Sequence, residues 1–225
     1  MYLSLKYDTV IDKIKIYSDN LKNTRYNFDE KILANIIPKH KQDYLDSNLE
    51  YVYYISTLIN SFYSTRMGND RLFIVAKYIS EHKNIDSLEK ITQLIEEANN
   101  TPFKIKNKKN EIKYFKANSF LSKYYAIHNR ILFNNNKYSK YAILDSTVKK
   151  CIKEIIDNLN NKNSNYSKEF QTKFKQYKKK DIDDYTKLNE MLTIICNEIN
   201  KSRTSNNREM ITFTHLDRYF WGRYK

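Results

Sequence analysis

The scarcity of glycine and proline limits what this chain can fold into. Its 225 residues contain only Gly68, Gly222, Pro38 and Pro102. β-Sandwiches and barrels need many tight turns with positive φ, which glycine normally supplies, and dinucleotide and P-loop sites need a glycine-rich phosphate-binding loop. The sequence therefore predicts an all-α fold, with long helices joined by short polar connections.

The charge of the chain is strongly positive. Lys and Arg total 40 against 26 acidic residues, a formal net charge of +14. An AT-rich genome raises the lysine content by itself, but it does not explain the imbalance between lysine and acid as easily. We read the excess as a preference for polyanions, either phosphate backbones or acidic lipid surfaces, and expect nucleic acid as the partner.

Several other function classes find no support in the sequence. Cys151 and Cys196 lie in apolar helical patterns, so we expect buried thiols and no disulfide. The first twenty residues are charged throughout, unlike a signal peptide, and no stretch approaches the roughly 20 apolar residues of a membrane span. His40, His82 and His215 lack metal-ligand spacing. We expect a cytoplasmic protein without membrane, metal or cofactor, and favour a monomer.

Apolar residues recur at helical spacing along most of the chain. Residues 86–89, Asp-Ser-Leu-Glu, resemble a capping box that opens a helix ending near Asn99. The other predicted helices cover residues 10–20, 29–37, 42–63, 69–79, 119–128, 145–159, 181–202 and 214–224.

Two lysine-rich segments interrupt this pattern. Residues 102–116 are predicted to form an exposed basic loop, with room for a short irregular strand, and residues 168–180 form a second basic segment. Lysines in either segment could contact a phosphate backbone. Aromatic residues that interleave with the first cluster, and could stack on extruded or single-stranded bases, are Tyr114, Phe115, Tyr124 and Tyr125. The alternative is a solvated loop beside core aromatics.

Four segments together resemble the helix-hairpin-helix DNA glycosylases, particularly a bacterial group similar to 8-oxoguanine DNA glycosylases. They are residues 63–67 (YSTRM), 118–128 (NSFLSKYYAIH), 141–150 (YAILDSTVKK) and 216–222 (LDRYFWG). The resemblance covers roughly residue 64 to the C-terminus. It implies a two-lobed helical bundle with a central cleft, in which Lys123 and Asp145 face each other.

The resemblance also implies roles for individual residues. The Lys123 amine, once uncharged, would attack the anomeric carbon of a deoxyribose as the base leaves, and Asp145 would stabilise the cationic sugar. Cations expected to help the amine are Arg130, Lys149 and Lys150. Candidates for the lining of a pocket for the extruded base are Tyr124, Tyr125, His128 and Trp221. Candidates for DNA contacts are Arg66, Lys116, Asn118, Ser119 and Ser122.

The sequence departs from that family in the hairpin. The family's hairpin glycines, whose N–H groups hold a phosphate, have no counterpart in residues 116–122, and the four-cysteine iron–sulfur motif is absent. Three of these residues also have a simpler structural interpretation. Lys123 would be a solvated lysine, and Asp145 would be an N-cap that contributes about 1 kcal/mol to helix stability. His128 would be a hydrogen-bonded residue at a helix end. Arg66 would clamp a phosphate or pair with an acid, and Trp221 would anchor the last helix with Phe220.

The sequence thus predicts a DNA glycosylase that excises a damaged or modified base, with abasic-site lyase activity as a further possibility. We expect a single helical domain, with an N-terminal lobe over residues 1–100 and a hairpin-like catalytic lobe plus C-terminal helix over 101–225. One alternative is a non-catalytic nucleic-acid-binding protein with a degenerate glycosylase fold, for example in phage defence. Another is a helical protein–protein interaction domain with a codon-driven charge.

Overall fold

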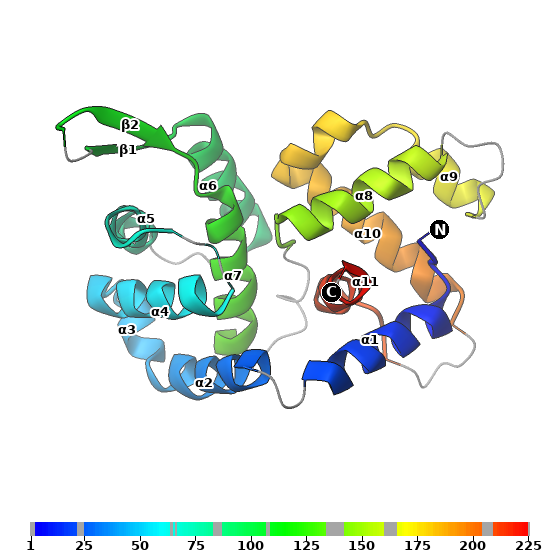
Figure 1. Ribbon diagram of the computed structural model, residues 1–225, viewed down its shortest axis with the longest axis horizontal. Coiled ribbons are helices and arrows are strands. Elements are labelled where there is room, and N and C mark those ends of the chain that lie inside the picture. The colour runs from blue at the N-terminus through cyan, green and yellow to red at the C-terminus, as the bar shows by residue number, and fades with distance from the viewer. Residues whose placement is uncertain are drawn as a thin grey trace. The chain divides into compact units, whose positions relative to one another are not determined.

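The computed structural model of the protein describes residues 3–21, 25–63, 65, 67–82, 87–106, 109–133, 142–159, 166–203 and 209–224. Within these residues the chain is mostly helical, as predicted, with a single two-stranded sheet (Figure 1). Its elements up to the sheet are α1 (Tyr7–Leu21), α2 (Arg25–Lys39), α3 (Lys41–Leu45), α4 (Leu49–Phe62), α5 (Asn69–Glu81), α6 (Leu88–Asn100), β1 (Phe103–Lys106) and β2 (Ile112–Phe115). The later elements are α7 (Asn118–Phe133), α8 (Ser146–Leu159), α9 (Lys168–Phe174), the 3₁₀ helix η2 (Lys179–Asp183), α10 (Tyr185–Lys201) and α11 (Phe213–Tyr224).

The chain forms two compact units. One, the terminal unit, combines Met1–Thr24 with Ser139–Lys225; the other, the inserted unit, is Arg25–Tyr138. This grouping differs from our predicted boundary near residue 100. The reason is packing: α1 packs on α11 and α10, whereas α7 packs on α2, α4 and α6. Each unit is described by itself below.

Helix α7 forms the core of the inserted unit. Every residue from Phe120 to Asn129 is buried, because α2, α4 and α6 pack around this helix. The face of α6 that supplies this packing carries four buried residues, Ile91, Leu94, Ile95 and Ala98. Burying an aliphatic side chain of this size contributes about 1.5–3 kcal/mol, so this helix pair is a major source of stability within the unit.

Polar caps set the starts of two helices in the inserted unit. Asn48 Oδ1 accepts hydrogen bonds from the Glu50 and Tyr51 N–H groups at 2.9 and 3.3 Å, which fixes the start of α4. Ser87 Oγ accepts from the Lys90 N–H at 3.2 Å and starts α6. The N-cap of α6 therefore lies inside the predicted capping sequence at residues 86–89.

The predicted basic loop at residues 102–116 contains a regular β-hairpin, which corrects the expectation of a mainly irregular segment. Strands β1 and β2 are antiparallel, and Phe103 is paired with Phe115 in their register. Strand β1 alternates apolar and polar residues, and the apolar ones are the less exposed, which suits a half-buried sheet. Between the strands, Asn110 takes up a positive φ of 60°, a conformation that Asn tolerates better than most residues.

The terminal unit is built around α10, α11 and α1. The buried face of α10 includes Leu188, Met191 and Ile195. Helices α1 and α11 approach so closely that a Cβ on Gly222 would lie 3.0 Å from Tyr17 Cβ, so the helix contact explains one of the two glycines. Cys151 and Cys196 are both buried and form no disulfide, as predicted.

The segment predicted as one helix over residues 181–202 is divided into η2 and α10. Asp181 Oδ2 accepts from the Lys178 N–H at 2.7 Å, and the Asp184 side chain accepts from the Lys187 N–H at 3.0 Å. Asp184 is therefore the N-cap of α10. Two carboxylates that bond to nearby backbone N–H groups compete with a continuous helix, and this competition explains the break.

The second basic segment, residues 168–180, is partly neutralised by nearby acids. Lys173 Nζ lies 2.7 Å from Glu169 Oε1, and Lys179 Nζ lies 2.6 Å from Asp157 Oδ1. Phe170 and Phe174 turn the other side of α9 into the core. The two basic segments predicted from sequence therefore differ in structure: one is a hairpin, and the other is a short helix and turn held by ion pairs.

Candidate functional site

The turn from β2 into α7 carries the predicted DNA-contacting residues of the inserted unit. Lys116 and Ser119 are exposed, and Lys116 Nζ donates to Asn99 Oδ1 at 3.0 Å. Ser122 is fully buried, and its hydroxyl donates to the Ser119 carbonyl at 3.1 Å. Asn118 Oδ1 is buried and has no hydrogen-bond partner in the part of the chain that the structure describes. Arg66 lies outside the described residues.

Lys123 lies on α7 and is only 7% exposed. No other lysine in the described ranges is buried. A lysine is almost never fully buried unless it is paired, because removing an ammonium group from water is costly. The simple reading of Lys123 as a solvated helix lysine is therefore wrong.

The residues after Lys123 join a buried cluster of aromatic rings. The ring of His128 stacks on Tyr124, with centroids 5.1 Å apart and planes 7° from parallel, and its centroid lies 4.4 Å from that of Tyr44. Tyr125 packs edge-on against Tyr124. Tyr124, Tyr125 and His128 are all fully buried, so these three predicted base-pocket residues lie together inside the inserted unit.

His128 is held in this cluster by two hydrogen bonds. Its Nε2 lies 3.0 Å from the Tyr51 hydroxyl, and its Nδ1 lies 3.1 Å from Asn129 Oδ1. Because an amide oxygen can only accept, Nδ1 carries the proton and Nε2 accepts from Tyr51. Burial lowers the pKa of His128 from 6.5 to about 4, so its ring is neutral at pH 7. Its predicted hydrogen bonding is confirmed, but α7 continues to Phe133, so it does not end the helix.

The hydroxyls of Tyr124 and Tyr125 are also buried. Neither has a hydrogen-bond partner in the described ranges, and burial raises the pKa of both well above the ordinary value of a tyrosine. The cluster is therefore uncharged at neutral pH. Buried polar atoms of this kind carry a desolvation cost of about 1–3 kcal/mol each.

Asp145 is the N-cap of α8 in the terminal unit. Its Oδ1 accepts hydrogen bonds from the N–H groups of Thr147 and Val148, both at 2.9 Å, and the residue is 6% exposed. The predicted N-cap role is confirmed. The carboxylate also benefits from the positive end of the α8 dipole. Asp145 thus belongs to the terminal unit and Lys123 to the inserted unit.

The remaining predicted residues are placed as follows. Lys149 Nζ forms an ion pair with Asp183 Oδ1 at 2.5 Å, and Lys150 is exposed. In the inserted unit, the Arg130 guanidinium lies 4.0 Å from Glu30. Trp221 lies on α11 and is half-buried. Lys149 and Arg130 thus each lie beside an acid of their own unit.

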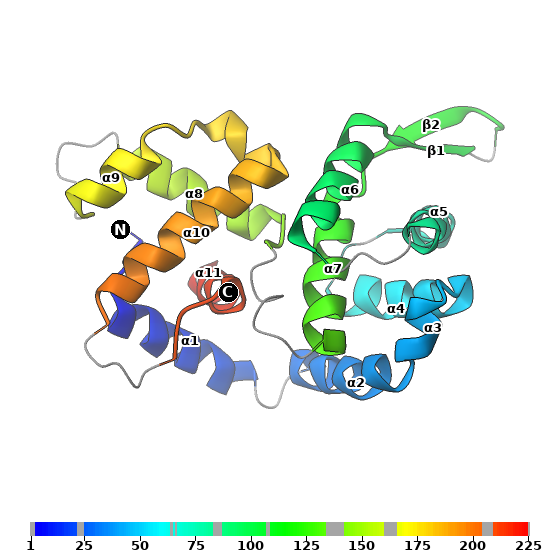
Figure 2. The same cartoon turned by 180° about the vertical axis from the view of Figure 1, so that it is seen from behind.

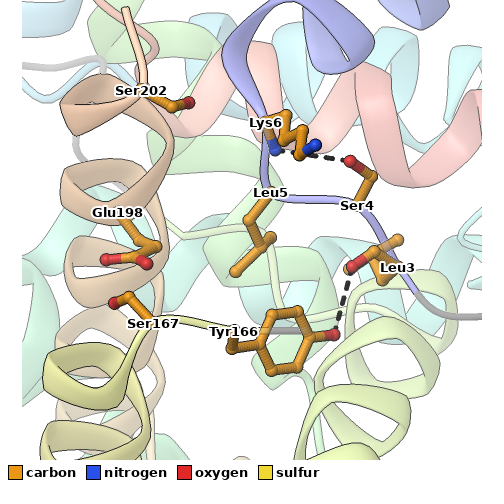
Figure 3. Close-up of a pocket in the computed structure, with 8 residues that line it drawn as sticks. All are labelled: Leu3, Ser4, Leu5, Lys6, Tyr166, Ser167, Glu198 and Ser202. Carbon is orange, nitrogen blue, oxygen red and sulfur yellow. Dashed lines mark hydrogen bonds between the residues drawn. The ribbon is translucent and has the colours of Figure 1, made fainter. Parts of the chain in front are cut away.

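The sequence did not single out a cavity in the terminal unit (Figure 3). Its volume is about 440 Å³, and its lining residues are Leu3, Ser4, Leu5, Lys6, Tyr166, Ser167, Glu198 and Ser202. The Tyr166 hydroxyl donates to the Leu3 carbonyl at 3.1 Å, and Ser202 Oγ accepts from the Tyr7 N–H at 2.8 Å. None of the residues predicted for catalysis or DNA contact lines this cavity. The apolar residues before α1 are the only signal of this cavity in the sequence.

Across the described ranges, no three His, Cys, Asp or Glu side chains gather in a group that could hold a metal ion. Likewise, none of the helices described combines the length and apolar character that crossing a membrane requires.

Comparisons of the chain with protein-family models, with curated proteins and with solved structures find no match. The function must therefore be inferred from the burial, charge and contacts of the residues described above.

Proposed function

We propose that the protein is a DNA glycosylase that excises a damaged or modified base, with the Lys123 amine as nucleophile and the Asp145 carboxylate as its electrostatic partner. The observation that carries this proposal is their burial. Among the Asp, Glu, Lys and Arg residues that the structure describes, the buried ones are Asp29, Lys123, Asp145 and Asp181. Two of these four are the residues for which the sequence predicted catalytic roles.

Burial favours a functional role because charged groups are costly to remove from water. Asp181 has an evident structural role, since it accepts from the Lys178 N–H and pairs with Lys187 Nζ at 2.8 Å. Asp145 has a structural role as a cap, which is compatible with chemistry because catalytic carboxylates also benefit from fixed orientation. Lys123 is the one buried lysine of the described ranges, and this burial supports a chemical role for it.

The proposed chemistry follows from these two groups. The uncharged amine of Lys123 attacks C1′ of the deoxyribose as the bond from C1′ to the base nitrogen breaks, and the electron pair of that bond leaves with the base. Loss of the amine's proton and opening of the sugar give a Schiff base, which water hydrolyses or which eliminates the 3′ phosphate. Asp145 stabilises the positive charge that develops on the sugar. Both groups must reach the same deoxyribose for this mechanism.

Borohydride trapping tests the proposal directly. The protein is incubated with labelled duplexes that carry 8-oxoguanine, uracil, another modified base or an abasic site, and the Schiff base is reduced. The variants are Lys123→Gln and, as a matched control, Lys77→Gln, which alters an exposed lysine of α5. We expect a covalent complex on an intact modified base with wild type and with Lys77→Gln, and none with Lys123→Gln.

The control matters because basic proteins trap weakly on abasic sites through surface amines. Trapping on an intact base that persists in Lys123→Gln would exclude Lys123 as the nucleophile. An absence of trapping on every intact base, together with salt-sensitive DNA binding, would favour a non-catalytic nucleic-acid-binding protein. The basic hairpin at residues 103–115 supports that second candidate, since it carries lysines on an exposed sheet.

A further inference from the structure

The β1–β2 hairpin has two different faces. Side chains alternate across a strand, so Phe103, Ile105 and Phe115 share one face. Phe103 and Phe115 stack with centroids 5.4 Å apart, and Phe103 packs edge-on against Tyr78 of α5 at 5.1 Å. The Arg71 guanidinium lies 5.3 Å from the Phe115 ring centroid. This inner face anchors the hairpin to α5.

The outer face carries lysines and apolar side chains. The register pairs Lys104 with Tyr114 and Lys106 with Ile112, so all four side chains lie on this face. Tyr114 and Ile112 are 63% and 56% exposed, and Tyr114 is the most exposed large hydrophobic side chain in the described ranges. Lys104 Nζ lies 5.9 Å from the Tyr114 ring centroid. Figures 1 and 2 show the hairpin at the edge of the inserted unit, beside α5 and α6.

The structure also separates the aromatic residues that interleave with the first lysine cluster in the sequence. Phe115, Tyr124 and Tyr125 are buried, which leaves Tyr114 as the exposed ring of that group. An exposed ring between lysines is the arrangement by which proteins hold single strands, since lysines contact phosphates while the ring stacks on a base. In an intact duplex the faces of the bases are covered by their neighbours. The chemistry of this face therefore fits an unpaired strand better than a duplex.

We infer that the outer face of the β1–β2 hairpin binds an unpaired stretch of DNA, with Lys104 and Lys106 on successive phosphates and Tyr114 stacked on a base. The two lysines are about 7 Å apart along their strand, and charge complementarity selects the phosphate backbone as the occupant. This inference goes beyond base excision, because strand binding by the hairpin needs neither Lys123 nor Asp145.

The lysines are tested by the salt dependence of binding to a labelled twelve-nucleotide oligothymidylate, measured by fluorescence anisotropy. Each phosphate contact on a single strand contributes about 0.7 to the slope of log K against log salt, so Lys104→Gln/Lys106→Gln lowers the slope by about 1.4 and weakens binding about 25-fold at 0.1 M salt. The matched control is Lys39→Gln/Lys41→Gln, which removes the same charge from exposed positions of the same unit and is expected to change the slope much less.

The stacking role of Tyr114 is tested with a second ligand, a twelve-unit oligomer of stable abasic sugar phosphates. Tyr114→Ala weakens binding to the oligothymidylate by about 5- to 150-fold, the range measured for base–aromatic stacking, and leaves binding to the abasic oligomer unchanged. Tyr114→Phe retains the ring and the affinity. Tyr54→Ala, which removes a 48% exposed tyrosine of α4, is the matched control.

Two outcomes would overturn the inference: hairpin variants that bind as tightly and with the same salt slope as their controls, or a Tyr114→Ala variant that loses affinity equally for both oligomers. Circular dichroism of each variant excludes unfolding as the cause of a loss. The proposed function is tested independently of this inference. Trapping on an intact base together with unchanged binding by the hairpin variants would overturn only this inference. Weakened binding by the hairpin variants without any trapping would overturn only the glycosylase proposal.

Discussion

Substitution of Asp145 separates its structural role from its proposed catalytic role. Alanine removes the acceptor of two backbone N–H groups, those of Thr147 and Val148. Loss of an N-cap costs about 0.5–2 kcal/mol. Because Asp145 is 6% exposed, water replaces the lost acceptor poorly, so we expect a loss near the upper end, about 2 kcal/mol. In a chain of this size that loss lowers Tm by about 4–8 °C.

Asparagine at the same position keeps the cap and removes the charge. Its amide oxygen accepts the same two hydrogen bonds, and Asn and Asp are about equally favourable N-caps. The favourable interaction of the charge with the helix dipole is lost, which costs about 0.3–1 kcal/mol. The excision rate, however, falls by about 100-fold or more, as when other preorganised electrostatic groups are removed from an active site.

The assay pairs thermal unfolding with single-turnover excision of the base identified by trapping. We expect Asp145→Asn to melt within about 4 °C of wild type and to excise slowly, and Asp145→Ala to be impaired in both. If Asp145→Asn melts as low as Asp145→Ala, the cap contributes less than its geometry suggests. If Asp145→Asn excises at the wild-type rate, the catalytic role of Asp145 is refuted.

Two further predictions concern buried groups. The pKa of His128 falls from 6.5 to about 4 on folding, so between these pH values the unfolded chain binds more protons than the folded protein. The contribution of His128 to stability is therefore constant above about pH 7 and falls by about 3 kcal/mol as the pH drops to 4. Urea unfolding should show this loss in wild type and a smaller one in His128→Gln, and equal pH profiles would contradict the assignment. Cys151 is fully buried and burial raises the pKa of Cys196 to about 12, so a thiol-specific disulfide reagent should label neither in the native protein and both in guanidinium. Rapid native labelling would place a thiol at the surface.

Amphipathic helices were the most predictable part of the fold. The period of the apolar residues in α5, α8 and α11 is visible without any tertiary information, since each of these helices buries one face. Helix α7 was predicted too short. The helix is buried on all sides over Phe120–Asn129, so its polar residues also lie inside the unit. The spacing of apolar residues therefore does not mark where this helix begins and ends.

The hairpin shows where reasoning from composition reaches its limit. A scarcity of glycine correctly predicted little β structure in the described residues, but a hairpin does not require glycine, and here Asn110 takes up a positive φ. Apolar and polar residues alternate over 103–106 in the sequence, but the density of lysines favoured a loop. Which of its aromatic residues remained exposed depended on the packing against α5, which no local pattern reveals.

The candidate site was predictable only in part. The cap role of Asp145 follows from its place before an apolar helix, and the structure confirms it. The burial of Lys123 was not predictable, because it depends on helices α2, α4 and α6 packing around α7. The roles of both residues on a deoxyribose remain predictions that trapping and the Asp145 variants address.

The packing of α1 on α11 has a consequence for synthesis of the protein. The segment before α1 and Tyr7 are held by late residues: Tyr7 donates to the Glu209 carbonyl at 2.7 Å, and Tyr219 donates to the Ser4 carbonyl at 2.8 Å. On the ribosome, α1 emerges before α11, and about 190 residues separate the end of α1 from the start of α11. The inserted unit is translated within that interval, so it can fold before α1 acquires the partner on which it packs.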